Sequence, residues 1–181
     1  YITARNLQMY KCQGNGTKDL DPAATRSQVG SFLQGCINVY LSECQFNDTF
    51  GESDAIVNFN CSNSHNFIAE NCQFNNAQGG QLAKEIAGIH MSDSPQQQTE
   101  GNGMKFIDCQ FNGARVSDAN PGDDVAILSG FLAITLRNII FENCQACNIQ
   151  TTNPNFRVFG FTLGTVAADA IPLHTNVRNI T

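Results

Sequence analysis

The dipeptide Cys-Gln occurs five times in this chain of 181 residues, each time in a similar apolar frame such as NVYLSECQFN or GMKFIDCQFN. Successive copies are separated by 32, 28, 37 and 35 residues. Repeats of unequal length do not suit a helical array, whose units must match, but they are natural where a short strand alternates with loops of variable length. The chain is therefore a repeat protein. The repeated cysteines are Cys12, Cys44, Cys72, Cys109 and Cys144.

Within each frame, apolar residues fall five and three residues before the cysteine, at the cysteine and two residues after it. Val39, Leu41, Cys44 and Phe46 are one example. The two-residue steps predict strands with one face toward a core. The three-residue step just before the cysteine breaks this alternation, so we expect a corner there, where Asn and Asp tolerate the bend. Corner residues of this kind are Asn71, Asp108 and Asn143.

A second apolar stretch precedes most frames. No segment has a convincing run of the i, i+3, i+4, i+7 spacing of a helix, and Asn, Gly, Ser and Thr are plentiful between the apolar stretches. We therefore predict an all-β chain whose units stack, because one unit cannot bury an apolar face alone. The second strands are expected at 29–34, 55–60, 87–92, 125–130 and 157–162. Long inter-strand loops are expected at 76–86, 93–103, 113–124 and 148–156.

Phrases such as FIDCQFN and FENCQ resemble the rungs of the right-handed parallel β-helix, the pectate-lyase-like superfamily, and the resemblance covers essentially the whole chain. It implies one solenoid over 1–181 with about five turns, wound right-handed as parallel crossovers are. It leaves the function open, because this superfamily includes polysaccharide lyases, glycoside hydrolases, phage tailspikes, adhesins and inert spacers.

The last residues are expected to start another turn. Arg178-Asn179-Ile180 matches Arg137-Asn138-Ile139 of the fifth frame, so we expect the next frame to begin there. The chain is accordingly interpreted as a fragment of a longer protein, with end-to-end continuation into flanking domains. Exposed strand edges would otherwise invite association.

The frame cysteines share one inward position, which predicts a ladder of reduced thiols acting as small hydrophobes between Phe layers. Such a ladder suits synthesis in a reducing cytosol. Cys36 and Cys61 lie at similar points of adjacent turns, which would let them stack with each other. Cys144 and Cys147 form a single CxxC motif without the second ligand pair that a tetrahedral zinc site needs, so no metal is expected there.

Two ladders of amide side chains are also predicted. Asparagines three residues after the frame cysteines are expected to bond their neighbours one turn away and to satisfy the backbone of the turn. These are Asn15, Asn47, Asn75 and Asn112. Outward glutamines should form a second, exposed ladder, made of Gln13, Gln45, Gln73, Gln110 and Gln145.

The net charge of −6, with scattered basic residues, lacks the electrostatic footprint of a nucleic-acid binder. No apolar run approaches the roughly 18 residues of a membrane span, so no membrane insertion is expected. The Asn-, Gln-, Cys- and Phe-rich rungs are similar in style to β-helix repeats common in giant viruses and amoeba-associated microbes. This similarity implies a virion or cell-surface component. The long loops on a stiff scaffold are where we expect a polysaccharide or a protein partner to bind, with a homotrimeric spike as one arrangement.

The candidate catalytic residues are four acidic residues and His90. Asp123-Asp124, preceded by glycine, resembles the Gly-Asp-Asp segment of the polygalacturonase family, whose paired aspartates serve as acid and base and must flank one bond at roughly 5–10 Å. Asp54 and Glu85 precede the corresponding strands of other turns, so stacking would place these acids about one rung apart. His90 is expected to point outward beside them. Calcium held by the acids is the alternative interpretation, and no other cofactor is expected.

The chain also departs from the polygalacturonase pattern. Ala87 stands where that family has an aspartate, and 156–164 carries neither its His-Gly nor its Arg-Ile-Lys motif. Gly-Asp-Asp before a strand is ordinary turn chemistry as well. We therefore expect a non-catalytic β-helix module that serves as a structural rod or a recognition surface. The alternative is a polysaccharide hydrolase or lyase that acts at the acidic residues.

Overall fold

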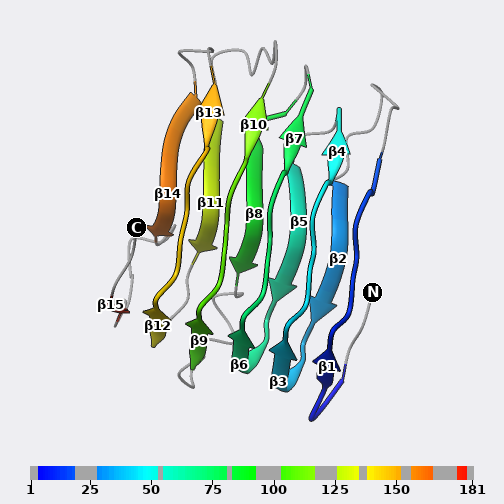
Figure 1. Ribbon diagram of the computed structural model, residues 1–181, viewed down its shortest axis with the longest axis vertical. Coiled ribbons are helices and arrows are strands. Elements are labelled where there is room, and N and C mark those ends of the chain that lie inside the picture. The colour runs from blue at the N-terminus through cyan, green and yellow to red at the C-terminus, as the bar shows by residue number, and fades with distance from the viewer. Residues whose placement is uncertain are drawn as a thin grey trace.

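A computed structural model describes residues 4–18, 28–52, 55–80, 83–92, 103–116, 126–134, 138–151, 156–164 and 175–178. Every regular element in these ranges is a β-strand, and no helix occurs in them. All strand pairs are parallel, and the strands of three sheets follow one another cyclically along the chain. Figure 1 shows the strands stacked from one end to the other, with the two termini at opposite ends. The predicted all-β parallel β-helix solenoid is confirmed.

The three sheets carry the names used below. The long-strand sheet contains β2 (Gln28–Gln34), β5 (Ala55–Ser62), β8 (Glu85–Ser92), β11 (Ala126–Ile134) and β14 (Phe156–Gly164). The frame sheet contains β1 (Gln8–Tyr10), β3 (Ile37–Ser42), β6 (His65–Glu70), β9 (Met104–Ile107), β12 (Ile139–Glu142) and β15 (Thr175–Arg178). The short-strand sheet contains β4 (Phe50–Gly51), β7 (Gln78–Gly79), β10 (Arg115–Val116) and β13 (Gln150–Thr151).

Both predicted strand sets are present, but three details of the prediction were wrong. The short-strand sheet lies partly in segments predicted as loops, because two-residue strands leave no periodicity in the sequence. The sixth frame begins earlier than expected, since β15 pairs Arg178 with Glu142. Cys61 is in register with Leu33, whereas Cys36 aligns with the turn at Ser64, so the two cysteines occupy different columns.

The corners of the solenoid are residues in the left-handed region of backbone conformation. The corner residue just before each frame cysteine has φ between 51° and 54° in all five turns. The residues are Lys11, Glu43, Asn71, Asp108 and Asn143. This confirms the corner predicted from the three-residue step. Two further left-handed columns occur six residues before and four residues after the cysteine. The first consists of Asn and Gly and the second of Asn, Asp and Gly, which reach this region at low cost.

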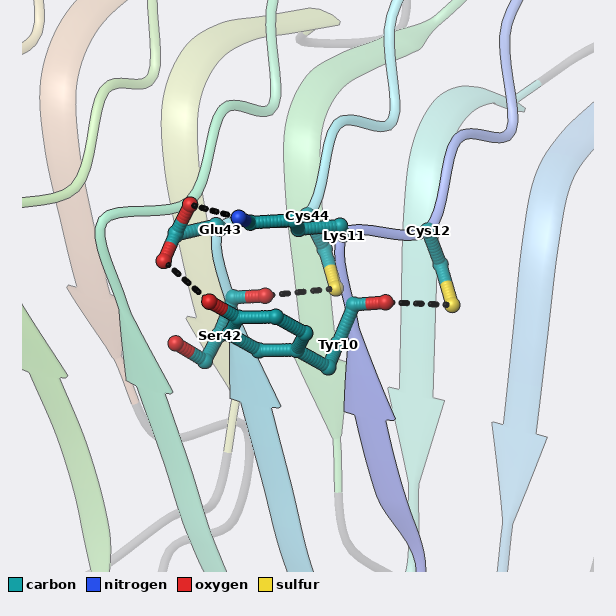
Figure 2. A network of polar contacts seen from close by, with 6 residues as sticks. All are labelled: Tyr10, Lys11, Cys12, Ser42, Glu43 and Cys44. Atoms are coloured by element: carbon teal, nitrogen blue, oxygen red, sulfur yellow. Dashed lines mark hydrogen bonds and ion pairs between the residues drawn. The ribbon is translucent and has the colours of Figure 1, made fainter.

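The frame cysteines and phenylalanines fill the main core. Cys44, Cys72, Cys109 and Cys144 are at most 1% exposed, and none of the eight cysteines of the chain forms a disulfide. Each frame thiol donates a hydrogen bond to the carbonyl two residues earlier, as Figure 2 shows for Cys12 and Cys44. Burial raises the pKa of the Cys44 thiol, so it stays neutral. The predicted inward thiol ladder is confirmed.

Phenylalanines form parallel stacks beside the thiols. Phe46, Phe74 and Phe111, two residues after successive frame cysteines, stack with ring centroids 5.7 and 5.5 Å apart and interplanar angles of 14° and 8°. Such offset pairs contribute roughly 0.5–1.5 kcal/mol each beyond their buried area.

At the surface of the first turns, the Tyr10 hydroxyl donates to Glu43 at 2.9 Å, and Lys11 lies 3.6 Å from the same carboxylate (Figure 2).

A pinch divides the interior into two cores. Gly88 approaches the backbone of Phe74 so closely that a Cβ atom on Gly88 would lie 2.2 Å from the Phe74 carbonyl oxygen. The equivalent residues of the other turns are Gly30, Asn58, Gly130 and Gly160. Beyond the pinch lies a smaller side core under the short-strand sheet, made of Ile56, Ala77, Ala83, Ile86, Ala114, Val116, Leu128 and Phe156.

The asparagine ladder stabilises the backbone of the turns. The Oδ1 atoms of Asn15, Asn47, Asn75 and Asn112 each accept the N–H of the equivalent residue in the next turn, at 2.8–3.0 Å. The last of these donors is the backbone of Cys147. The predicted role in satisfying the turn backbone is confirmed. At the glutamine positions, the structure shows a continuous series of parallel backbone bridges, and the exposed amide ladder stays a prediction.

We expect Asn75→Ala to lower the free energy of unfolding by roughly 1–3 kcal/mol, because the Asn112 N–H would lose its acceptor in a part-buried site. Urea denaturation followed by far-UV circular dichroism measures this change. Asn15→Ala is the matched control in the same ladder. Asn15 is exposed, so water can replace the lost acceptor and the cost should be smaller. Equal losses in the two variants would contradict the burial argument.

Candidate functional site

A polar groove lies over the outer face of the short-strand sheet. It has a volume of about 360 Å³ and draws its lining from three consecutive turns. The lining residues are Asp48, Thr49, Phe50, Asn76, Gln78, Gly113 and Arg115. The groove therefore runs across the turns, in the direction in which the strands stack.

Two columns of residues build this groove. The first contains the left-handed residues four positions after each frame cysteine, Gly16, Asp48, Asn76, Gly113 and Asn148. The second contains the residues six positions after each cysteine, Lys18, Phe50, Gln78, Arg115 and Gln150, held in parallel register by the short strands. Because both columns keep a fixed offset from the cysteine, equivalent side chains recur about 4.8 Å apart.

In the first column, the groove is open at Gly113, which has no side chain. A Cβ atom at this position would lie 2.3 Å from Oδ1 of Asn76, so a side chain there would make the Asn76 amide turn from its present orientation. The Asn76 amide donates from Nδ2 to Oδ1 of Asp48 at 3.0 Å. The floor of the groove thus presents an ordered amide–carboxylate pair beside an open space.

The second column supplies an aromatic surface and cations. The Lys18 ammonium lies 5.5 Å from the centre of the Phe50 ring, which is partly exposed. Gln78 and Arg115 are exposed on the next two turns. An amide offers both donors and an acceptor, and a guanidinium offers five donors in a fixed fork. This combination of planar polar groups with one aromatic ring suits a ligand rich in hydroxyl groups.

The sequence predictions missed this groove. Four of its seven lining residues fall in the segments predicted as loops at 76–86 and 113–124, and the other three lie at 48–50, directly after the second frame. The signal was nevertheless available, because the lining residues other than Thr49 occur at constant distances of four and six residues after each frame cysteine. The side chains themselves vary from turn to turn, and that variation concealed the regularity.

Two predicted catalytic residues, Glu85 and His90, meet on the long-strand sheet. Nδ1 of His90 lies 2.9 Å from Oε1 of Glu85, and the side chains are 15% and 25% exposed respectively. Residues five apart on a straight strand could not touch. Here the strand dips inward at Gly88, so side chains on either side of the pinch can converge. Fully buried Ala87 lies between them in the sequence.

The surroundings of this pair are uncharged along the sheet. Glu85 is in register with Ala55 and Ile127, and His90 is in register with Asn60 and Leu132. Among the residues described, no hydrogen bond reaches Nε2 of His90, and that atom is buried. Among the described residues, Oε1 of Glu85 accepts no aligned hydrogen bond either, although it lies 2.9 Å from Nδ1 of His90.

The remaining predicted catalytic residues, Asp54, Asp123 and Asp124, lie outside the described residues. Strand β5 begins directly after Asp54, β11 begins two residues after Asp124, and Glu85 is itself the first residue of β8. In the described ranges, no group of three or more His, Cys, Asp or Glu side chains is arranged to hold a metal ion. Those ranges also contain no helix long and apolar enough to cross a membrane.

We compared the chain with protein-family models, with curated proteins and with solved structures. None of the three comparisons found a match.

Proposed function

We propose that this protein is a non-catalytic recognition module that binds a polysaccharide in the groove over the short-strand sheet. The observation that carries the proposal is the groove itself, a hollow of about 360 Å³ lined by polar side chains from three turns. Small polar sets of this kind, placed by a rigid scaffold, fix the orientation of a ligand. The left-handed corners and the stacked Phe core supply that rigidity.

A polysaccharide fits this groove better than other polymers do. A peptide that binds by strand addition needs a sheet edge, whereas the groove lies over a sheet face and offers side chains. Nucleic acid is disfavoured by the net charge of −6. A hydroxyl-rich chain can use amide, carboxylate and guanidinium groups together, and its ring faces can pack on Phe50.

In the same proposal, the module belongs to a virion or a cell surface, as one part of a longer rod or of a trimeric spike. The absence of any disulfide among the eight cysteines, most of which lie in the core, supports synthesis in a reducing cytosol before display. A stiff solenoid that carries binding residues on one face suits such a surface component.

We expect Arg115→Ala to weaken polysaccharide binding by about tenfold or more, since a hydrogen bond from a charged donor contributes roughly 1.5–3 kcal/mol. The measurement is isothermal titration against a panel of soluble xylan, glucomannan, mixed-linkage β-glucan, alginate and polygalacturonate. Arg157→Ala is the matched control, because Arg157 is equally exposed but lies on β14 of the long-strand sheet. Lack of binding to any polymer, or equal losses in both variants, would reject the groove as the binding site.

The second candidate function is polysaccharide hydrolysis or β-elimination, and the close contact of Glu85 with His90 favours it. In hydrolysis, one carboxyl group protonates the leaving oxygen while another activates water. Asp54, Asp123 and Asp124 are the further carboxylates proposed for this site. The same panel, with and without calcium, reveals it through new reducing ends or unsaturated products. Activity that disappears in Glu85→Gln, Asp123→Asn or Asp124→Asn would make the protein an enzyme.

A further inference from the structure

The two columns that line the groove continue beyond both of its ends. In the turn before it, Lys18 forms a parallel bridge with Phe50, and in the turn after it, Gln150 pairs with Arg115. Both extra residues are exposed and continue the column of Phe50, Gln78 and Arg115 without a shift in register. The potential binding surface thus spans five turns, two more than the groove.

The ends of the groove also lack a barrier among the described residues. On the Lys18 side, the first column ends in Gly16, where even an added Cβ atom would meet no atom of a described residue within 4 Å. On the other side it continues through exposed Asn148. A site that recognises a chain terminus needs a wall that the terminal sugar abuts. At this surface, by contrast, a polysaccharide chain can extend past both ends of the groove.

The repeat distance of the surface suits a linear polymer that runs along the solenoid axis. Equivalent side chains recur about every 4.8 Å, which is close to the length of one sugar in an extended chain. Successive sugars would therefore meet successive turns, and each added sugar would gain contacts until the five turns are covered. A branched or terminal sugar cannot use this periodicity.

We infer that the groove binds internal, unbranched segments of a linear polysaccharide, with Lys18 and Gln150 as outer contacts on either side of the central Phe50, Gln78 and Arg115. This inference rests on the proposed function of the groove. Beyond that function, it gives the axis along which the ligand runs, the ligand length at which affinity stops rising, and two contact residues that do not line the groove.

The test uses sized oligosaccharides, prepared by partial acid hydrolysis of the polymer that binds most tightly in the panel. Affinity should rise by about tenfold or more from the disaccharide to the tetrasaccharide and level off near five sugars, because each sugar adds one or two hydrogen bonds. The free monosaccharide should fail to displace the polymer. Equal affinity for monosaccharide and hexasaccharide would overturn the inference and leave groove binding intact.

Variants separate the outer contacts from the centre. Lys18→Ala and Gln150→Ala should each weaken hexasaccharide binding by about three- to tenfold and leave disaccharide binding unchanged. Gln8→Ala, an exposed glutamine on β1 of the frame sheet, is the control and should change neither. Unchanged hexasaccharide affinity in both outer variants would overturn the five-turn surface. Failure of every polymer to bind the wild type would instead reject the proposed function.

Discussion

Replacing Cys72 by Asp is expected to remove most of the stability of the fold, at least about 4 kcal/mol of the roughly 5–15 kcal/mol that a domain has. Cys72 is fully buried in the middle of the thiol ladder, and its sulfur donates to the carbonyl of Glu70 at 3.3 Å. A carboxylate there would lose its water without gaining a cation. Urea denaturation followed by far-UV circular dichroism measures the loss.

The pH dependence of that variant identifies the cause. Burial raises the pKa of the introduced carboxyl above its value of about 3.9 in the unfolded chain. The folded state therefore binds the extra proton more tightly, so the penalty is smallest below pH 4 and grows as the pH rises above it. A loss that does not depend on pH would indicate steric disruption instead.

Two controls separate charge from size. Cys72→Ala removes only the sulfur and should cost about 1–2 kcal/mol. Gln73→Asp introduces the same carboxyl one residue later, on the half-buried outward column, and should cost less than Cys72→Asp. Near wild-type stability of Cys72→Asp would mean that the thiol does not face the core.

The frames carried enough information to predict the corner, the inward cysteine and the asparagine ladder. Each depends on a residue type that recurs at a fixed distance from Cys72 and its equivalents, because stacked turns put equivalent residues in contact. Asn75 illustrates this, since its acceptor oxygen meets the N–H of Asn112 one turn away. Where the geometry of one turn repeats in the next, the sequence pattern repeats with it.

Features that join parts of the same turn could not be predicted in this way. His90 was expected beside the acidic residues, but its close contact with Glu85 depends on the inward dip at Gly88, which no two-residue periodicity contains. The side core depends on short strands such as Gln78–Gly79, which are too brief to show a period. The groove could have been predicted only by knowing that the residues six positions after each cysteine are in register across turns. The prediction of loops in these segments hid that register.

The pinch that escaped prediction is also where the smallest substitution should have a large effect. Gly88→Ala adds one methyl group, but its Cβ would lie 2.2 Å from the carbonyl oxygen of Phe74 and 2.8 Å from that of Gly130. Both obstacles are backbone atoms held in parallel strands or turns, so neither can rotate away as a side chain could. We expect a loss of about 3 kcal/mol in the free energy of unfolding.

Gly160→Ala is the matched control, because Gly160 occupies the same column in the last described turn of the long-strand sheet. Among the described residues, its added Cβ would meet Ala146 alone, at 3.3 Å from the side chain and 3.7 Å from the carbonyl. A modest clash there is offset by the reduced freedom of the unfolded chain, so the net change should stay within about 1 kcal/mol. Urea denaturation of both variants under identical conditions measures the difference. Equal losses of unfolding free energy in the two variants would mean that the backbone at the pinch can move to accommodate a methyl group.

The same substitution connects the core to the groove. Phe74 lies two residues before Asn76, whose amide forms part of the groove floor. Because the new methyl group pushes on the Phe74 carbonyl, the left-handed turn at Asn76 has to move with it. Gly88→Ala should therefore weaken polysaccharide binding even at temperatures where the variant remains folded, whereas Gly160→Ala should not. Wild-type affinity in folded Gly88→Ala would show that the pinch and the groove are independent.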